Sequence, residues 1–292
     1  MILLTGATGN VGSKLLRRLT ADGQRVRCLV RDPRRLGPER VRVQIALGDL
    51  ADPGSFRNAM RGVKTVVHLA APMRDQARVS IEELNGVATH RLVHAAERAG
   101  AERFVFFSAM GATEHSPTRF FRSKALAERA VAESSVPSTI FAPSIVYSPG
   151  NYWLTVMERL TWLPAVPIAG AGRAAYQPIW AEDVVDCVLA ALERDGGEST
   201  RYELAGPQTL TYDDMARLVM RAAGRRRRLL HLPLPVVRAT LGAFEAVMAG
   251  ATVATWEEAQ LMEAPMTSAT GTAGAAELGV SPRPMREVLA AT

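Results

Sequence analysis

The sequence predicts an α/β protein with a Rossmann-like, doubly wound parallel sheet and a smaller C-terminal substrate lobe. Two observations lead to this prediction. The apolar run 1–4 leads directly into Thr5-Gly6-Ala7-Thr8-Gly9-Asn10-Val11-Gly12, a glycine-rich turn that opens a helical pattern. Short β-rich runs then alternate with helical segments, an order typical of parallel strands joined by crossover helices.

The glycine-rich turn predicts a dinucleotide site. Gly6 can form the tight turn out of the strand, Gly9 leaves room for a pyrophosphate, and Gly12 lets the helix pack closely on the sheet. Free N–H groups and the positive dipole end of the next helix, residues 10–20, would face the phosphates. The candidate cofactor-binding residues here are Gly6, Thr8, Gly9, Asn10, Val11 and Gly12. The alternative is a turn with a structural role alone.

Seven β-rich runs supply the strands of the predicted sheet. They cover residues 1–5, 25–31, 43–47, 65–69, 103–107, 138–141 and 201–205. A core helix is expected over residues 81–99, where Gly100 is a stop signal. Its apolar face consists of Leu84, Val87, Ala88, Leu92, Val93, Ala95 and Ala96.

The regular alternation breaks after Pro143, where prolines and glycines surround a short helix at residues 152–160. A strand-helix unit at residues 176–194 returns the chain to the core. We therefore expect residues 1–150 to form an NAD(P)-binding Rossmann core that is completed by about 175–205. Residues 151–174 and 206–292 form the smaller lobe.

The C-terminal part contains Arg225-Arg226-Arg227-Arg228, an apolar stretch at 229–235 and an apolar helix at 236–248. A basic run beside an apolar helix is one signature of attachment to an anionic membrane surface. The other interpretation is a solvated helix end, a short strand and a packed helix. We favour the second, so membrane contact is open but not expected.

Composition sets broad limits on the class of protein. A chain of 292 residues with 48% hydrophobic content can bury one large core, or one core and a small lobe. The two cysteines, Cys28 and Cys187, have no metal-ligand spacing and are expected to be buried thiols, so no metal site is predicted. The net charge of +6 comes from scattered arginines with few aromatics, which favours a solvated basic surface over a nucleic-acid site.

A cytoplasmic location is the expectation from the N-terminus and from hydropathy. Met1 already lies in the first strand, which leaves no room for a signal peptide. No apolar stretch approaches the roughly 18 residues of a membrane span.

A second motif accompanies the glycine-rich turn. Ser108 ends the apolar run 104–107, and the segment 116–128 carries Lys124 four residues after Phe120. Together with the glycines, this resembles the short-chain dehydrogenase/reductase superfamily. It is most similar to the atypical NmrA-like branch and to relatives of the nucleotide-binding accessory subunit of respiratory complex I. The resemblance extends from residue 1 to about residue 205.

The resemblance implies further cofactor contacts. Gly48-Asp49-Leu50 looks like the adenine-contacting loop, His68-Leu69-Ala70-Ala71 like the strand end beside the cofactor, and Pro143-Ser144-Ile145-Val146-Tyr147 like the nicotinamide segment. The residues carried over are Asp49, Leu50, Ala70, Ala71, Pro143 and Ile145. Ala142 and Ser148 depart from the pattern, since relatives often have arginine and glycine there.

Active members of that superfamily combine a serine, a tyrosine and a lysine, and this chain has Phe120 at the tyrosine position. Ser108 would polarise a substrate oxygen, and Lys124 would hold a ribose hydroxyl and supply positive charge. Loss of a placed general acid commonly costs about 10² to 10⁴ in rate. The possible substitutes are Tyr147, Tyr152 and His115, although each also fits a packing or surface role.

The end of the second strand bears on the choice of cofactor. A 2′-phosphate needs a cation there, whereas a free 2′-hydroxyl is usually held by Asp or Glu. Arg31 ends the strand, with Asp32 next and Arg34-Arg35 behind it. This favours NADP(H), while Asp32 keeps NAD(H) possible.

Two classes of function remain open from the sequence. One is an unusual NADP(H)-dependent oxidoreductase that acts on an apolar carbonyl or alkene. The other is a non-catalytic NADP(H) sensor, or a structural or regulatory protein that the nucleotide stabilises. The substrate, turnover and the oligomeric state are not determined by the sequence.

Overall fold

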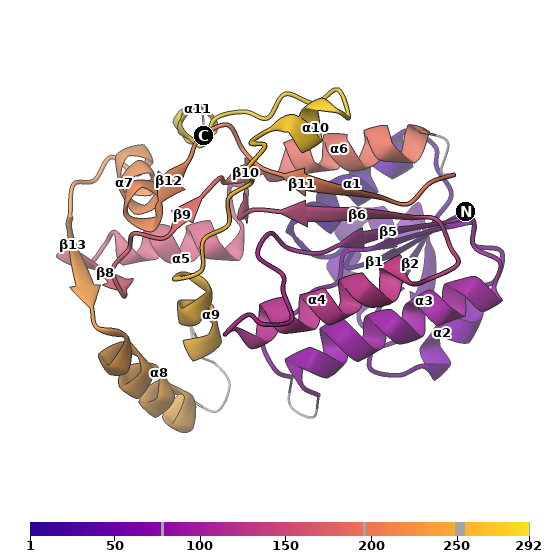
Figure 1. Cartoon of the computed structure of the whole chain (residues 1–292), viewed down its shortest axis with the longest axis horizontal. Helices are drawn as coiled ribbons and strands as arrows, with labels where there is room; N and C mark the ends of the chain where they lie inside the picture. Colours follow the sequence, from indigo (N-terminus) through magenta and orange to yellow (C-terminus); the bar gives the residue numbers. More distant parts are fainter. Residues whose placement is uncertain (77–78, 195–196, 249–254, 292) are drawn as a thin grey trace.

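Seven parallel strands form the central sheet of the computed structural model, which describes residues 1–76, 79–194, 197–248 and 255–291 (Figure 1). Their bounds are β1 Ile2–Thr5, β2 Val26–Val30, β3 Gln44–Leu47, β4 Thr65–His68, β5 Arg103–Phe107, β6 Ser138–Pro143 and β11 Thr200–Leu204. They follow the order β11-β6-β5-β4-β1-β2-β3, with every pairing parallel. The predicted α/β fold and its seven strands are confirmed.

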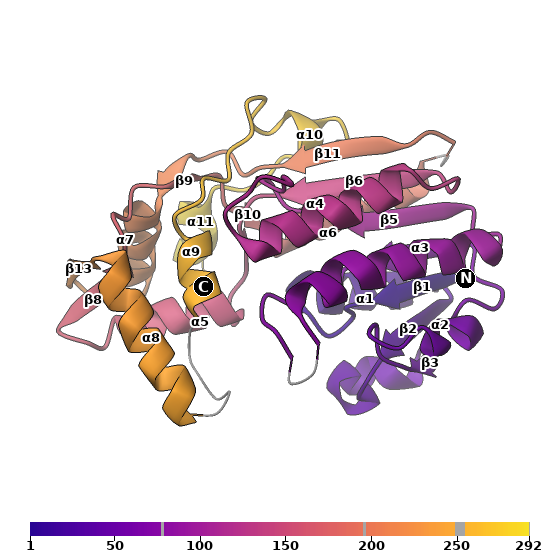
Figure 2. The same ribbon diagram turned by 60° about the horizontal axis from the view of Figure 1, so that its bottom comes forward.

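Helices cover both faces of the sheet (Figures 1 and 2). One face packs on α1 (Asn10–Ala21) and α6 (Ala181–Glu193), where Leu4, Val67 and Val105 are fully buried. The other face packs on α2 (Gly54–Ala59), α3 (Ala88–Arg98) and α4 (Arg119–Ala132). Strands buried on both faces read as nearly continuous apolar runs, which is why they were visible in the sequence.

The predicted helix over residues 81–99 contains a π-helical turn, η2 (Glu83–Val87), before α3 begins. Val87 is 42% exposed, so its predicted place on the buried face is wrong. The wider π turn holds one more residue than an α turn, which shifts the side chains around the axis. Gly100 ends the helix with φ +67°, as expected.

The C-terminal lobe contains short strand pairs and helices around its own apolar cluster. β7 (Val146–Tyr147) pairs with β10 (Ile179–Trp180), β8 (Ala165–Ala169) with β13 (Arg228–Leu232), and β9 (Ala175–Tyr176) with β12 (Leu210–Thr211). The helices are α5 (Tyr152–Leu160), α7 (Tyr212–Ala222), α8 (Leu234–Met248), α9 (Trp256–Leu261), α10 (Ala273–Ala276) and α11 (Met285–Ala290). Outside this lobe, a 3₁₀ segment, η1 (Pro33–Val41), follows β2 of the central sheet.

Two predictions about this half of the chain need correction. The strand-helix unit expected at residues 176–194 returns the chain to the core through α6, but its strand, β9, pairs with β12 and not with the central sheet. The apolar helix α8 is not a packed helix over residues 234–243, where Val237, at 7% exposure, is the single buried side chain. Within the described ranges, no helix has the length and apolar content to cross a membrane.

The two cysteines are buried and unpaired, as predicted. Cys28 lies in β2 and Cys187 in α6, on the same face of the sheet. Burial raises the pKa of each thiol to about 12, so both stay protonated.

An ion pair between a buried aspartate and a half-exposed arginine joins the C-terminal segment to the core. Asp183, in the first turn of α6, is 2% exposed and accepts three hydrogen bonds from Arg283, at 2.7 to 2.9 Å. The Arg283 guanidinium also lies over the Trp180 ring, 3.7 Å from its centroid.

We predict that Asp183→Asn lowers the free energy of unfolding by roughly 1.5 to 3 kcal/mol, because charge-assisted hydrogen bonds to a buried carboxylate are lost. Urea denaturation measures the change. Asp186→Asn is the matched control on the same helix, since its ion pair with Arg18 is solvent-exposed and worth at most about 1 kcal/mol. Equal losses in the two variants would contradict the structural role of the Asp183–Arg283 pair.

Candidate functional site

A cavity of about 910 Å³ lies at the carboxyl ends of the central strands, which face the C-terminal lobe (Figure 1). It opens at the point where the strand order reverses, between β1 and β4. Ligands of open α/β sheets bind in the crevice at this point. The glycine-rich turn forms one end of the cavity, and side chains of the C-terminal lobe form the other.

The glycine-rich turn is packed backbone against backbone. A Cβ on Gly12 would lie 2.1 Å from the carbonyl oxygen of Gly6, and a Cβ on Gly6 would lie 2.6 Å from the Ala70 nitrogen. Gly9 caps α1 without any side-chain hydrogen bond to the first helical N–H groups. Those N–H groups and the helix dipole are therefore available to a phosphate. The turn fits the pyrophosphate of a dinucleotide.

Most of the predicted site residues line this cavity. The lining includes Gly6, Thr8, Gly9, Asn10, Val11, Gly12, Arg31, Asp49, Leu50, Ala70, Ala71, Ser108, Phe120, Pro143 and Ile145. The structure thus brings the three segments that the resemblance singled out to one edge of the sheet. Lys124 and Tyr147 do not belong to the lining.

Lys124 points into the protein and not toward the cavity. Its side chain is buried, its Nζ donates to the carbonyl oxygen of Phe107, and it lies 4.3 Å from the centroid of the Phe106 ring. Burial lowers its pKa to about 7. In this arrangement the long side chain packs from α4 onto β5, and the predicted role of Lys124 in holding a ribose hydroxyl stays a prediction.

His68 is also withdrawn from the cavity. Its Nδ1 lies 2.6 Å from the Thr5 hydroxyl and its Nε2 lies 2.9 Å from the Thr89 hydroxyl. Burial, and then the nearby Lys124 charge, lower its pKa to about 3, so the ring is neutral. His68 supports the strand end and has no open route to a substrate.

Ser108 lines the cavity directly after the carboxyl end of β5. It is 5% exposed, and its Oγ has no hydrogen-bond partner among the described residues. Buried hydroxyls are nearly always paired, so an unpaired one at a cavity wall is a position for a ligand atom. Phe120 lines the same cavity and offers no donor.

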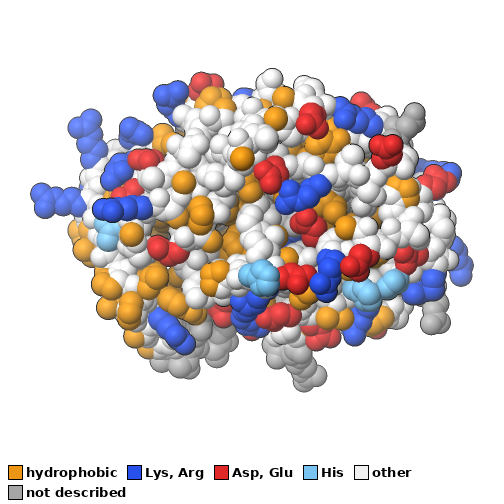
Figure 3. All heavy atoms as spheres, viewed as in Figure 1, with side chains coloured by type: hydrophobic (Ala, Val, Ile, Leu, Met, Phe, Trp, Pro, Cys, Tyr) orange, Lys and Arg blue, Asp and Glu red, His pale blue; other side chains and the backbone are white. Residues whose placement is uncertain are grey.

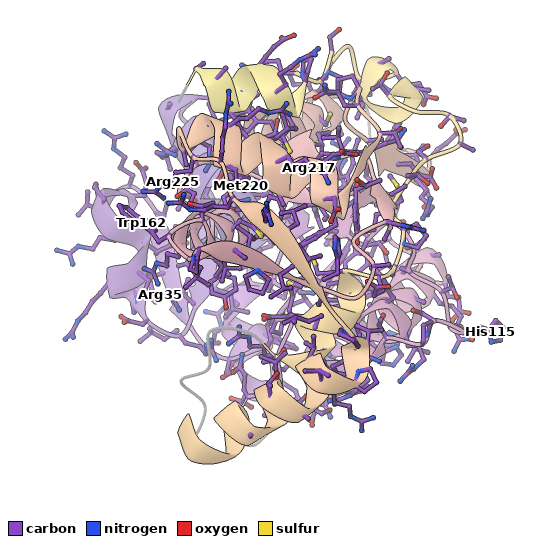
Figure 4. All side chains as sticks on the ribbon, turned by 90° about the vertical axis from the view of Figure 1, so that its left-hand side faces the viewer. Arg35, His115, Trp162, Arg217, Met220 and Arg225 are labelled. Carbon is purple, nitrogen blue, oxygen red and sulfur yellow. The ribbon has the colours of Figure 1, made fainter. Side chains whose placement is uncertain are left out.

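Of the three possible substitutes for the missing tyrosine, one lies at the cavity. Tyr147 is fully buried in the lobe, and burial raises its pKa, so its proposed substitution for the tyrosine is not supported. His115 is an exposed loop residue that points away from the protein (Figure 4). Tyr152 lines the cavity, and its hydroxyl accepts a 2.6 Å hydrogen bond from Nη2 of Arg74.

The end of the cavity beside β2 carries two arginines, Arg31 and Arg35. Arg31 donates to the Gln76 side chain, and its Nη1 lies 3.9 Å from Oδ2 of Asp49. Asp32 also borders the cavity, but its Oδ1 accepts a 2.9 Å hydrogen bond from the Arg34 nitrogen at the start of η1. Its carboxylate is thus engaged as a helix cap.

The cavity lining also includes a set of apolar side chains, which we call the apolar chamber. They are Phe120, Phe121, Trp153, Leu261, Met262 and Met266. The last three come from the C-terminal segment and were not predicted, because no local pattern links them to the glycine-rich turn. Arg35 and Arg74 were likewise missed as site residues, although the sequence placed Arg35 close behind the second strand.

Charged pairs hold the C-terminal segment over the cavity. Arg74 donates to both carboxylate oxygens of Glu258 at 2.7 and 2.8 Å. Arg119, at the start of α4, is bonded to Asp75 and Glu82 and lies 3.7 Å from Glu257. The hydrogen bonds from Arg119 lower the pKa of Glu82 to about 2.

Comparison with protein families agrees with this geometry. Residues 6–161 match the family described as NAD(P)H-binding. Three similar proteins illustrate its range. A (4-alkanoyl-5-oxo-2,5-dihydrofuran-3-yl)methyl phosphate reductase of Streptomyces griseus is 32% identical, over 82% of this chain and 80% of the relative. An NAD(P)H azoreductase of Xenophilus azovorans is 29% identical, over 80% and 78%.

The third is the mitochondrial NADH dehydrogenase [ubiquinone] 1 alpha subcomplex subunit 9 of Arabidopsis thaliana, which is 28% identical over 80% of this chain. The chain spans 60% of that subunit's length. Among solved structures, gox2253 superposes with a TM-score of 0.74 and 26% identity, covering 99% of this chain and 96% of that one. A UDP-glucose 4-epimerase of Thermus thermophilus with bound NAD has the same fold, with a TM-score of 0.74, 18% identity and the same two coverages.

We predict that Gly9→Val abolishes nucleotide binding. A Cβ on Gly9 meets the Gly6 carbonyl oxygen at 3.2 Å and no other described atom within 4 Å, so a larger side chain extends into the phosphate position. A nucleotide at about a hundredfold excess over its Kd stabilises a protein by roughly 2.7 kcal/mol, which a melting curve detects. Gly197→Val, at an open exposed position, should keep the full shift. A full shift in Gly9→Val would show that the turn is structural.

Proposed function

Because the chain belongs to the NAD(P)H-binding family, as an atypical member of the short-chain dehydrogenase/reductase superfamily, we propose that it is an NADP(H)-dependent reductase of apolar substrates. The observation that carries the proposal is the continuity of the cavity. One space connects the glycine-rich turn with an apolar chamber, and the unpaired Ser108 hydroxyl lies at its wall.

NADP(H) is the preferred cofactor in this proposal. Arg31 and Arg35 place two guanidinium groups on the cavity beside β2, and a guanidinium can donate two charge-assisted hydrogen bonds to a phosphate. The Asp32 carboxylate accepts a backbone N–H, which leaves it poorly placed for a ribose hydroxyl. NAD(H) would leave both arginines without a phosphate partner.

The chain's own residues divide the remaining tasks. A bound nicotinamide dinucleotide supplies a hydride for an electrophilic carbon of the substrate. Ser108 donates a hydrogen bond to the substrate oxygen, while Phe120 and its apolar neighbours exclude water from the reacting carbon. Tyr152 is a protic side chain of the cavity lining, and its hydroxyl accepts a hydrogen bond from Arg74. The proton for the substrate oxygen comes from Tyr152 and is replaced from solvent.

In this proposal, nucleotide binding and substrate binding belong to different parts of the chain. Residues 1–150, completed by about 175–205, bind the nucleotide, whereas 151–174 and 206–292 provide the substrate side. The names of the two bacterial relatives, both reductases, support catalysis. The buried free thiols are compatible with a reducing compartment such as the cytoplasm.

A second candidate function is nucleotide binding without turnover, as a sensor or a nucleotide-stabilised subunit. Two observations favour it over an ordinary reductase: Phe120 at the tyrosine position, and the withdrawal of Lys124 from the cavity. The two candidates agree on the cofactor and differ in whether Tyr152 and Ser108 support hydride transfer.

We expect NADPH to bind more tightly than NADH, and Arg31→Ala with Arg35→Ala to remove most of the difference. Each charge-assisted hydrogen bond is worth roughly 1.5 to 3 kcal/mol. Titration calorimetry with both nucleotides measures the preference. Arg34→Ala is the matched control, because Arg34 lies between the two and does not line the cavity. Equal affinities in the unmodified protein would refute the NADP(H) preference.

The Phe120→Tyr variant distinguishes the reductase function from nucleotide binding without turnover. In this variant a hydroxyl enters the chamber that contains Ser108, and reduction of apolar ketones and aldehydes should rise by up to about 10² to 10⁴. Tyr152→Phe in the unmodified background should reduce any turnover that the protein already has. NADPH oxidation is followed by absorbance, with NADPH binding checked in each variant. Absence of turnover in the unmodified protein and in Phe120→Tyr would favour the non-catalytic function.

A further inference from the structure

The end of the lobe farthest from β3 combines exposed apolar and basic side chains. We define this basic-apolar face by Trp162, Leu163, Leu230, Val236, Arg225, Arg226, Arg227, Arg228 and Arg238. Figure 4 looks onto this end, where β13 crosses the lobe above α8 and where Trp162 and Arg225 lie together at one side. None of these side chains takes part in the nucleotide cavity.

The apolar members are strongly exposed. The exposed fractions are 72% for Trp162, 44% for Leu163, 51% for Leu230 and 48% for Val236. Single exposed apolar residues are ordinary, but these come from adjoining elements. Trp162 and Leu163 precede β8, Leu230 lies opposite Pro167 in the β13–β8 ladder, and Val236 follows β13 on α8. Figure 3 shows hydrophobic side chains gathered at this corner, below and beside basic ones.

The charge of this part of the chain is one-sided. Residues 215–244 contain seven arginines and no aspartate or glutamate. On the N-terminal flank, Asp213 and Asp214 are paired with Arg217, and Asp213 also with His231, while Glu245 follows the stretch on its C-terminal side. Before Trp162, the nearest acidic residue in the sequence is Glu158 of α5. The arginine run therefore carries excess positive charge beside the apolar side chains.

Two arginines of the basic run contact Trp162 or its neighbour Thr161. The Arg225 guanidinium lies 3.5 Å from the centroid of the Trp162 ring, and its Nη1 donates to the Thr161 hydroxyl at 2.7 Å. Arg227 donates to the Thr161 carbonyl at 3.2 Å. Cationic and aromatic groups are thus presented together, with Arg226 and Arg228 exposed beside them.

We propose that the basic-apolar face binds the surface of a bilayer that contains anionic lipids. Tryptophan and aliphatic side chains enter the headgroup boundary, and arginines pair with lipid phosphates. A second copy of the chain fits less well, since a twofold interface would bring the two arginine runs together. A nucleic acid would use the arginines but would leave Leu230 and Val236 against water.

The basic-apolar face is connected to the cavity through α8 and α9. Arg238 of α8 lies over the ring of Trp256, the first residue of α9, with 5.6 Å to the centroid. α9 ends at Leu261, which lines the apolar chamber. If the proposed reductase function holds, a substrate dissolved in the bilayer would lie near that end of the cavity. Membrane binding itself does not depend on catalysis.

The test is co-sedimentation of the full chain with vesicles of phosphatidylcholine, with and without phosphatidylglycerol. We expect binding to the anionic vesicles and not to the neutral ones. Arg226→Glu combined with Arg228→Glu should weaken binding by at least roughly 30-fold, from the membrane contribution of each arginine. Arg40→Glu combined with Arg42→Glu, two exposed arginines near η1, has the same charge change and should leave binding intact.

A second pair of variants tests the apolar part. Trp162→Ser should weaken binding to anionic vesicles, whereas Val41→Ser, at an 82% exposed residue next to the control arginines, should not. The melting shift with NADPH confirms that every variant is folded. It also separates this proposal from the proposed function, because nucleotide binding and membrane binding are read independently.

Three outcomes would overturn the proposal. The first is no binding to anionic vesicles at low salt, and the second is an equal loss in the test and control charge variants. The third is a concentration-dependent dimer that Trp162→Ser disrupts while vesicles have no effect, which would assign the face to a second copy. Tighter binding to a DNA duplex than to anionic vesicles would likewise refute it in favour of nucleic acid.

Discussion

The close backbone approach at the glycine-rich turn is the constraint on which the rest of the site depends. A Cβ on Gly12 would clash with the carbonyl oxygen of Gly6, and a Cβ on Gly6 would clash with the backbone of Ala70. Side chains at either glycine would separate α1 from the sheet. Because both positions are glycine, the N-terminus of α1 can approach the ends of β1 and β4, where the strand order reverses. This sets the phosphate position relative to Ser108.

Burial then decides which polar groups take part in the chemistry. His68 of β4 and Lys124 of α4 are both buried between the sheet and its helices, and burial lowers the pKa of each side chain, which favours its neutral form. Among the described residues, Ser108 remains as an unpaired hydroxyl at the cavity wall, and the same wall includes the apolar Phe120. Such a chamber is well suited to excluding water and poorly equipped to transfer protons. Both candidate functions follow from this imbalance.

The C-terminal lobe completes the chamber through charged contacts. Arg74 with Glu258 and Arg119 with Glu257 hold α9 over the cavity, and Asp183 in the first turn of α6 binds Arg283 of the C-terminal segment. Of these carboxylates Asp183 is the most deeply buried, with 2% of its side chain exposed. Segments distant in the sequence thus form the substrate side.

The sequence by itself determined the sheet and the nucleotide end of the cavity. Strand runs and the glycine-rich turn are local patterns, and parallel strands bring their carboxyl ends to one edge. Tertiary structure alone decided the rest: Lys124 turns inward, Leu261 enters the chamber, and much of α8 stays exposed. Apolar periodicity shows that a residue can be buried, but the partner that buries it comes from elsewhere in the chain. Those contacts depend on packing between segments, which no local pattern encodes.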